Sequence, residues 1–401
     1  MADDETRRAG KRAWRGAVFA ALGLLVCPWV TEAQQVRRAI PVPPATSPWD
    51  SAAKFLAGVP LPPEAPLAAL QKPAAYREHS ASFEKLWARY NGHYFTPMRE
   101  WSLVELAPRI PRGAPVIYFF GGPDALAAMA YYPEAGDYLL GGLEPVGTLP
   151  APESLDDARR NSALKNLRQS TNVILSFGHF ITKDMKAELE ATDFQGVLPL
   201  LLTFVAMSGG EVLDVCYFSI RKDGGVENSS SAPVGPRGAI PGVRVTFRRS
   251  PASAPQRIHY VRADVSNDAL GSGGSVLAWA SSFGRGNVYL KAASYLMHEP
   301  YFSSIRKFLL EHADSVLQDD SGIPLRYFQD GRWRCWFFGK YSGTLDLFKK
   351  YHQADLEKAF EPGDGPLPFG TGYKWRLGAS NLMLAVPQAP PRAEPVSAPA
   401  E

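Results

Sequence analysis

Two acidic residues follow apolar runs that have the character of buried strands. Asp124 ends the turn Gly121-Gly122-Pro123-Asp124, and Glu144 lies in the turn after the next apolar run. Ligands of open α/β sheets bind beyond the carboxyl ends of the strands, so we expect Gly121, Gly122 and Asp124 to contact a ligand. Asp124 and Glu144 together could do acid–base work or hold a cation. The alternative is that Asp124 caps the following helix.

A serine and a histidine lie close together after a third apolar run, residues 173–177. Ser176 and His179 could form a nucleophile and its base if a turn brings them into contact. The sequence identifies no third residue that would orient the histidine. We therefore treat His179 as a candidate catalytic or polar site residue, without assigning it a reaction.

The segment 291–298 (KAASYLMH) carries polar residues at spacings of three and four. If it is helical, Lys291, Ser294, Tyr295 and His298 share one face. A Ser–Lys or Tyr–Lys pair could then be catalytic, which makes Ser294 and His298 candidates. The alternative is an amphipathic helix whose polar side is simply hydrated.

Two adjacent carboxylates, Asp319 and Asp320, precede a Ser-Gly turn and are a further candidate for ligand binding. Bound directly, a divalent cation would need about six to eight oxygen ligands, and the sequence shows only two here. The alternative is an ordinary surface turn.

Standard catalytic and cofactor motifs are absent from the sequence. It contains no G-x-S-x-G, no G-x-x-x-x-G-K-[ST], no H-E-x-x-H and no G-x-G-x-x-G. No closely spaced cysteine or histidine pairs indicate a structural zinc site. We therefore expect no cofactor and no metal.

Several apolar runs predict the elements that would position these residues. Residues 115–120, 137–140 and 173–177 are typical of buried parallel strands, with helices between them. Residues 212–220, 243–248 and 257–263 predict antiparallel strands joined by Gly/Ser/Pro-rich turns, and 197–207 predicts a buried helix. The expected fold is α/β: a mixed sheet with parallel N-terminal strands, inserted antiparallel strands and helices on its faces.

The N-terminus has the order of a secretory signal. Basic residues from Arg7 to Arg15 precede an apolar run, 16–30, and Thr31-Glu32-Ala33 has the small residues of a cleavage site. We expect export to the periplasm or beyond, with a lipid or helix anchor as the alternative. After the signal, 1–33, we expect a proline-rich linker at 34–66, one compound domain at 67–386 and a disordered tail at 387–401.

Composition restricts the partners. The 401 residues carry a net charge of +3, with 43 basic and 40 acidic residues, so no nucleic-acid-binding surface is indicated. Beyond the signal no apolar run is long enough to cross a bilayer, and we expect no transmembrane span in the mature chain.

Cleavage of the signal would remove Cys27 and leave two cysteines. Cys216 and Cys335 could form a disulfide in an oxidising compartment. The alternative is two buried free thiols, because both lie in apolar, strand-like surroundings.

Four phrases are similar to those of an uncharacterised family of exported bacterial proteins. They are GGPD (121–124), GLEPVG (142–147), KAASYLMH (291–298) and DDSGIP (319–324). The resemblance implies export and a single body at about 110–385. It implies no activity and no catalytic residue.

Two functions remain open from the sequence. The first is an envelope or periplasmic protein that binds a small molecule, an envelope component or another partner, which the missing catalytic motifs favour. The second is a hydrolase of an envelope polymer or ester, which the polar residues after buried strands favour. Convergence of those residues on one cleft would favour an enzyme.

Overall fold

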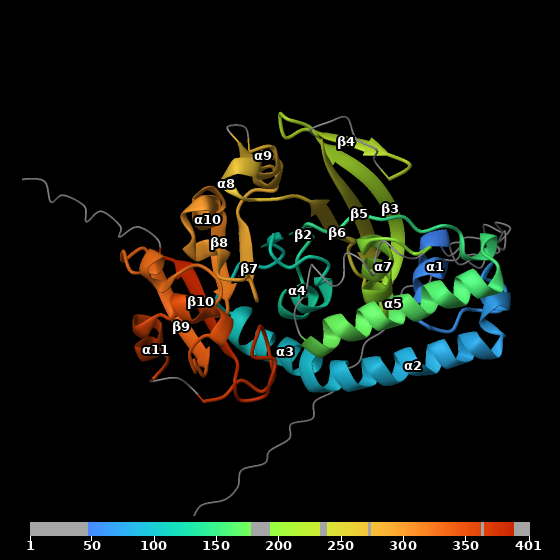
Figure 1. Ribbon diagram of the computed structural model, residues 1–401, viewed down its shortest axis with the longest axis horizontal. Coiled ribbons are helices and arrows are strands. Elements are labelled where there is room, and N and C mark those ends of the chain that lie inside the picture. Colours follow the sequence, from blue (N-terminus) through green and yellow to red (C-terminus); the bar gives the residue numbers. More distant parts are fainter. Residues whose placement is uncertain (1–46, 178–192, 233–238, 272–273, 362–364, 389–401) are drawn as a thin grey trace, which may run out of the picture. The chain divides into compact units, whose positions relative to one another are not determined.

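The computed structural model describes residues 47–177, 193–232, 239–271, 274–361 and 365–388. Within these residues ten strands form one sheet in the order β4-β3-β5-β6-β2-β1-β7-β8-β10-β9 (Figure 1). The strands are β1 Val116–Tyr118, β2 Asp137–Gly142, β3 Glu211–Ile220, β4 Val226–Ser229, β5 Ile240–Arg248, β6 Gln256–Arg262, β7 Gly286–Leu290, β8 Ala313–Gln318, β9 Trp333–Gly339 and β10 Asn381–Pro387.

The centre of the sheet is parallel and both of its ends are antiparallel. Strands β6, β2, β1, β7 and β8 pair in parallel. On one side β5, β3 and β4 continue the sheet antiparallel, and on the other side β10 and β9 do so. The predicted mixed α/β sheet is thus confirmed, including the antiparallel strands inserted after the first parallel pair.

Helices cover both faces of the sheet. The α-helices are α1 Pro48–Leu56, α2 Ala74–Tyr90, α3 Thr96–Trp101, α4 Ala125–Tyr131, α5 Asp157–Phe177, α7 Val197–Met207, α8 Asn267–Leu270, α9 Ser275–Ser281, α10 Ser303–His312 and α11 Ala354–Phe360. Short 3-10 or π turns are η1 Ala68–Gln71, η2 Asn91–Phe95, η3 Ser102–Leu106, η4 Pro152–Ser154, η5 Leu296–His298, η6 Pro300–Phe302, η7 Leu325–Phe328 and η8 Asp346–Tyr351.

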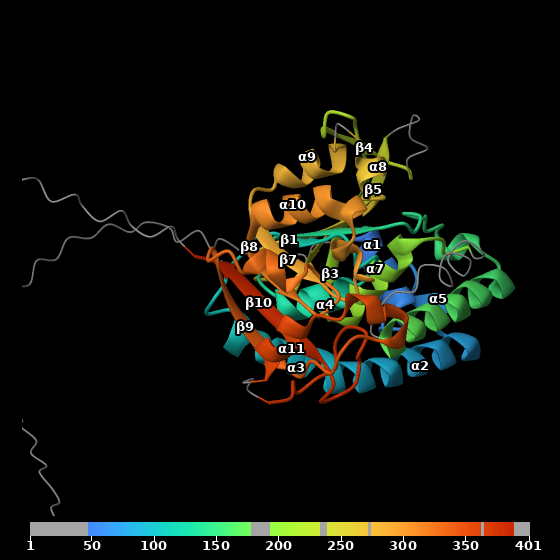
Figure 2. The ribbon, with the colours of Figure 1, turned by 60° about the vertical axis from the view of Figure 1, so that its left-hand side comes forward.

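The short central strand β1 shows why two layers of helices are needed. Its Val116 and Tyr118 belong to the core shared with α4 and α7, whereas Ile117 belongs to the core shared with α9 and α10. Successive side chains of a strand point to opposite faces, so an apolar strand must be covered on both sides. Figure 2 shows α9 and α10 on one side of the strands and α4 and α7 on the other.

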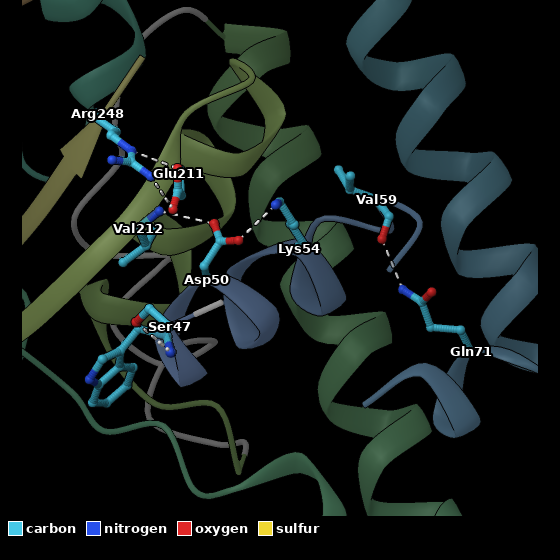
Figure 3. A network of polar contacts seen from close by, with 9 residues as sticks. Ser47, Asp50, Lys54, Val59, Gln71, Glu211, Val212 and Arg248 are labelled. Carbon is cyan, nitrogen blue, oxygen red and sulfur yellow. Dashed lines mark hydrogen bonds and ion pairs between the residues drawn. The ribbon is translucent and has the colours of Figure 1, made fainter. Parts of the chain in front are cut away.

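Residues 48–66, which the sequence predicts as linker, belong to the folded body from Pro48 on. Phe55 and Leu56 of α1 are fully buried. Asp50 accepts a hydrogen bond from the backbone N–H of Val212 (3.0 Å) and pairs with Lys54 (2.7 Å), as Figure 3 shows. The prolines of this segment misled the prediction, because proline is favoured in the first turn of a helix, as at Pro48.

Two further local patterns do not have the structure that they suggest. Residues 173–177, expected as a strand, are the last turns of α5, where Ile174 and Leu175 are buried against the body. The polar spacing would fit a helix over 291–298, but residues 291–295 form a loop in which Ala292, Ser294 and Tyr295 have positive φ angles of 49°, 53° and 56°. The helical spacing of polar residues there is coincidental.

The candidate disulfide is excluded. Cys216 lies on β3 and Cys335 on β9, near opposite ends of the sheet, and both are free. A disulfide needs Cα atoms within about 7 Å, whereas seven strands separate β3 from β9. Burial raises the pKa of the Cys335 thiol to about 11, so this cysteine stays protonated at neutral pH.

None of the helices in the described ranges is long and apolar enough to cross a membrane.

Candidate functional site

The order of the parallel strands reverses beside β1. From β1 the chain proceeds outward to β2 and β6, then returns to the other side of β1 for β7 and β8. At such a point the loops that follow the two neighbouring strands diverge, and a crevice opens at the carboxyl edge. The loops after β1 and β7 therefore border the expected ligand position.

A cavity of about 160 Å³ lies at this edge. Its wall comes from the ends of four parallel strands: Phe119, Phe120 and Gly122 after β1, Gly141 to Glu144 at β2, Ala263 to Val265 after β6, and Ala292 to Ser294 after β7, with Leu296 and Phe302 beside them. The wall is thus mostly apolar, with few polar side chains, as in binding pockets generally.

Glu144 is the buried polar residue of this wall. It is 1% exposed, and Tyr260 donates its hydroxyl to the Glu144 backbone oxygen (2.9 Å) and to Oε2 (3.2 Å). Within the described chain Oε1 has no hydrogen-bond donor. Leaving a buried acceptor unpaired costs about 1–3 kcal/mol. Glu144 therefore carries a buried acceptor next to the cavity that no donor of the described residues satisfies, and this oxygen has practically no accessible surface of its own.

The surroundings of Glu144 fix its side chain. Burial, and then the charge of Glu144, raise the pKa of Tyr260 well above its usual value, so the phenol remains a donor. A Cβ on Gly142 would lie 2.3 Å from Glu144 Oε2 and 3.0 Å from the Gly122 Cα. A side chain at position 142 would therefore displace the Glu144 carboxylate from its place beside Tyr260.

Asp124 is buried beside Lys291 and does not face the cavity as a free base. Its carboxylate forms an ion pair with the Lys291 ammonium and accepts the Tyr118 hydroxyl (3.0 Å). No side-chain hydrogen bond from Asp124 caps α4. Gly121 packs over the Tyr118 ring, where a Cβ would lie 2.2 Å from ring carbons, whereas Gly122 reaches the cavity wall. Asp124 thus stands at the N-cap position of α4 without a side-chain cap, and its contact with a ligand stays a prediction.

Asp319, Asp320 and Ser321 together hold the loop after β7. Asp319 accepts from the N–H of Ala292 (2.9 Å), and Ser321 Oγ accepts from the N–H of Ala293 (2.7 Å). Asp320 accepts the Tyr295 hydroxyl and a hydrogen bond from the Asn381 amide (3.0 Å). The two carboxylates therefore hold the loop through hydrogen bonds, and they are not among the described residues that line the cavity.

The loop that they hold is strained. A non-glycine residue in the left-handed region costs roughly 1 kcal/mol, and three of the four residues 292–295 adopt it. Such conformations persist only where surrounding contacts determine them, and they concentrate at functional sites. Here the strained backbone forms one wall of the cavity.

The remaining candidates differ in their relation to the cavity. Ser294 lines it, but its Oγ bonds to the Tyr373 hydroxyl (2.9 Å). His298 packs against the rings of Tyr295 and Tyr351. Burial lowers the pKa of His298 to about 4, so it is neutral at pH 7. His179 lies outside the described residues.

The polar candidates other than His179 thus gather at one edge of the sheet, but in two groups. Glu144 and Ser294 line the cavity. Asp124, Asp319 and Asp320 instead bond to residues of the loops beside it, and His298 packs against aromatic rings. Over the described ranges no group of three or more His, Cys, Asp or Glu side chains could hold a metal ion. The sequence did not identify Tyr118 and Tyr260 as partners of the two carboxylates, because tyrosines within apolar runs have the pattern of core residues. It singled out Lys291, but not as the partner of Asp124.

Comparison with known proteins gives no relative. No protein family, no curated protein and no solved structure matches the chain significantly. The resemblance to exported bacterial proteins therefore gains no support from these comparisons, and the function must be argued from the site.

If the loop is strained, relieving the strain should stabilise the protein. We expect Ala292→Gly to raise the free energy of unfolding by about 1 kcal/mol, because glycine adopts a positive φ without a steric cost. The control is Ala128→Gly in α4, where a buried helical position should lose about 1 kcal/mol or more. Urea unfolding measures both. Equal destabilisation by the two substitutions would contradict the strain.

Asp319 should make stability depend on pH. Burial, and then the charge of Asp320, raise its pKa to about 6, although hydrogen bonds from Ser321 and Ala292 act in the opposite direction. The folded state therefore binds a proton more tightly than the unfolded state. Its stabilising contribution is complete below about pH 4 and is lost as the pH rises through about 6, a change of roughly 2–3 kcal/mol.

The measurement compares unfolding free energies of the wild type and Asp319→Asn between pH 4 and pH 8. We expect the wild type to lose stability relative to the variant between about pH 4 and pH 6, and the difference to level off above pH 7. Asp346→Asn, at an exposed carboxylate, is the control and should give a flat difference. A difference that is flat or rises for Asp319→Asn would show that this carboxyl has no raised pKa.

Proposed function

We propose that the chain is a small-molecule-binding protein whose ligand occupies the cavity beside Glu144. The observation that carries the proposal is the buried Glu144 carboxylate, in the cavity wall, with one oxygen that no donor within the described residues satisfies. A ligand donor in the cavity removes this cost once the Glu144 side chain turns Oε1 toward it, because in the structure that oxygen has practically no accessible surface. The position at the reversal of strand order supports the same site.

The hydrolase alternative has less support. Hydrolysis through a serine needs a base within hydrogen-bond reach of the nucleophile. Ser294 is the serine of the cavity wall, and its hydroxyl bonds to the phenol of Tyr373. We therefore favour binding over ester or polymer hydrolysis.

The binding proposal is tested with a screen and one substitution. Sugars, polyols, amines and nucleosides are screened by thermal shift, and the affinity of any ligand found is measured by titration calorimetry. We expect Glu144→Gln to weaken binding about tenfold to a hundredfold, because a hydrogen bond to a charged acceptor contributes about 1.5–3 kcal/mol.

The matched control is Glu134→Gln, which removes an exposed carboxylate that faces Arg112. It should leave both affinity and melting temperature unchanged. If no compound in the screen raises the melting temperature, or if Glu144→Gln binds as tightly as the wild type, the proposal is wrong.

We also propose that the protein is exported and that its ligand is met in the periplasm or outside the cell. The support is the basic, apolar and small-residue order of residues 7–33. Cleavage after Ala33 would leave α1, which begins at Pro48, intact. Expression in a bacterial host, fractionation and N-terminal sequencing should find a chain that begins at Gln34 in the periplasm or medium. An uncleaved cytoplasmic chain would refute export.

A further inference from the structure

We infer that the chain has a second binding site, in which Arg306 holds the carboxylate or phosphate group of a small organic anion. The site is a cavity of about 930 Å³ along α10, and it shares no lining residue with the Glu144 cavity. The inference therefore goes beyond the proposed function and does not depend on it. It follows from the free edge of the Arg306 guanidinium, the charge of the wall and the size of the cavity.

The cavity is built from several elements around α10. One face of this helix lines it with residues at the three- and four-residue spacing of neighbours on a helix surface: Arg306, Lys307, Leu310 and Glu311. Further lining comes from η7, where Tyr327 supplies aromatic surface, and from the start of β9 and the end of β10. The volume lies within the roughly 300–1,000 Å³ of cavities that enclose drug-sized ligands. The cavity therefore has room for an organic molecule and not only for a single inorganic ion.

Arg306 belongs to the wall of this cavity and is held in one place by the chain. It is 9% exposed, and its Nη1 donates hydrogen bonds to the backbone oxygens of Met297 (2.6 Å) and Glu299 (3.2 Å). The central carbon of the guanidinium lies over the Tyr327 ring, 4.5 Å from the ring centroid. Because these contacts already fix the side chain, a ligand does not have to order it, which lowers the cost of binding.

The remaining edge of the guanidinium, formed by Nε and Nη2, is free. Neither nitrogen has a hydrogen-bond partner among the described residues, and neither is fully buried, in contrast to Glu144 Oε1. An arginine edge of this kind pairs with a carboxylate or phosphate through two parallel hydrogen bonds. The chain uses the same edge where Nε and Nη2 of Arg257 donate to the two Asp137 oxygens (2.7 and 2.9 Å). The structural hydrogen bonds of Arg306 involve Nη1 alone, so this edge is available to a ligand.

The charges around the cavity leave Arg306 without a counterion. The three other cations that line the cavity each have a carboxylate partner: Arg285 pairs with Asp314 (2.9 Å), Arg332 with Asp330 (2.7 Å) and Lys307 with Glu311 (3.8 Å). Among the described residues no carboxylate forms an ion pair with Arg306, whose partners are backbone oxygens. A buried charge without a counterion is costly, so an anion stabilises this site and a cation does not.

The test is titration calorimetry on the full-length protein with glycerol 3-phosphate, glucuronate and inorganic phosphate, and with glycerol and glucose as neutral counterparts. We expect at least one organic anion to bind and its neutral counterpart not to bind. Arg306→Lys keeps the charge but replaces the two-pronged edge by a single ammonium, so affinity should fall at least about tenfold. The matched control is Arg326→Lys. Arg326 is exposed and also lies over the Tyr327 ring (5.0 Å), but it does not line the cavity, and affinity should stay within about threefold.

A charge reversal tests the cavity even if Arg306→Lys does not fold. Lys307 lines the cavity with an exposed side chain, so Lys307→Glu should fold and should weaken anion binding about tenfold through the like charge. The matched control is Lys349→Glu, at an exposed lysine that also pairs with a carboxylate but lies outside the cavity. It should bind as the wild type does. Thermal unfolding of each variant checks that it is folded.

The same data identify the anionic group and can overturn the inference. Binding of glycerol 3-phosphate alone supports a phosphate ester as ligand, and binding of glucuronate alone supports a carboxylate. The inference is overturned if neither organic anion binds, if inorganic phosphate binds as tightly as the organic anions, or if a folded Arg306→Lys or Lys307→Glu protein binds as tightly as the wild type. Glu144→Gln should not change the affinity for the anion. A loss of anion binding in that variant would place the anion in the other cavity and would also overturn the inference.

Discussion

The buried ion pair between Lys291 and Asp124 is the interaction on which the carboxyl edge depends. Lys291 is 3% exposed, and its ammonium also lies over the ring of Trp375, 5.9 Å from the centroid. Removing one member of a buried pair leaves an uncompensated charge, which costs several kcal/mol. The pair connects the loops after β1 and β7, where the strand order reverses, and so it fixes the two sides of the crevice relative to each other.

The rest of the site follows from that connection. The residues directly after Lys291 take up left-handed conformations, and Asp319 and Ser321 hold their backbone N–H groups. A strained loop that is tied to β1 at one end and to the turn after β8 along its length has little freedom to relax. The chain itself therefore holds the cavity wall that this loop forms, which would lower the ordering cost of binding the proposed ligand.

The sequence predicted the sheet and the edge at which the candidate site lies, but not the contacts within it. The run 115–120 is apolar enough to require burial on both faces, and this places Asp124 and Glu144 at the carboxyl edge. The loop at 291–295 could not be predicted, because its polar spacing imitates a helix and its φ angles depend on Asp319, Asp320 and Ser321. Similarly, 173–177 has the composition of a strand, but in the structure it continues the helix α5, which begins at Asp157. The distance between Cys216 and Cys335 could not be predicted either, because it depends on the order of the strands in the sheet.

The carboxylates at the carboxyl edge of the sheet differ in the partners that their oxygens have. Asp124 is neutralised by Lys291, and Asp319 and Asp320 are occupied by donors of the chain itself. Among the described residues, the Glu144 carboxylate accepts a hydrogen bond from the Tyr260 hydroxyl alone, and Glu144 belongs to the cavity wall. An internal donor added there would remove an unsatisfied oxygen at little cost, and Gly142 is kept small so that the carboxylate keeps its place. Glu144 therefore differs from the other carboxylates of this edge in keeping one buried oxygen, Oε1, without a donor among the described residues.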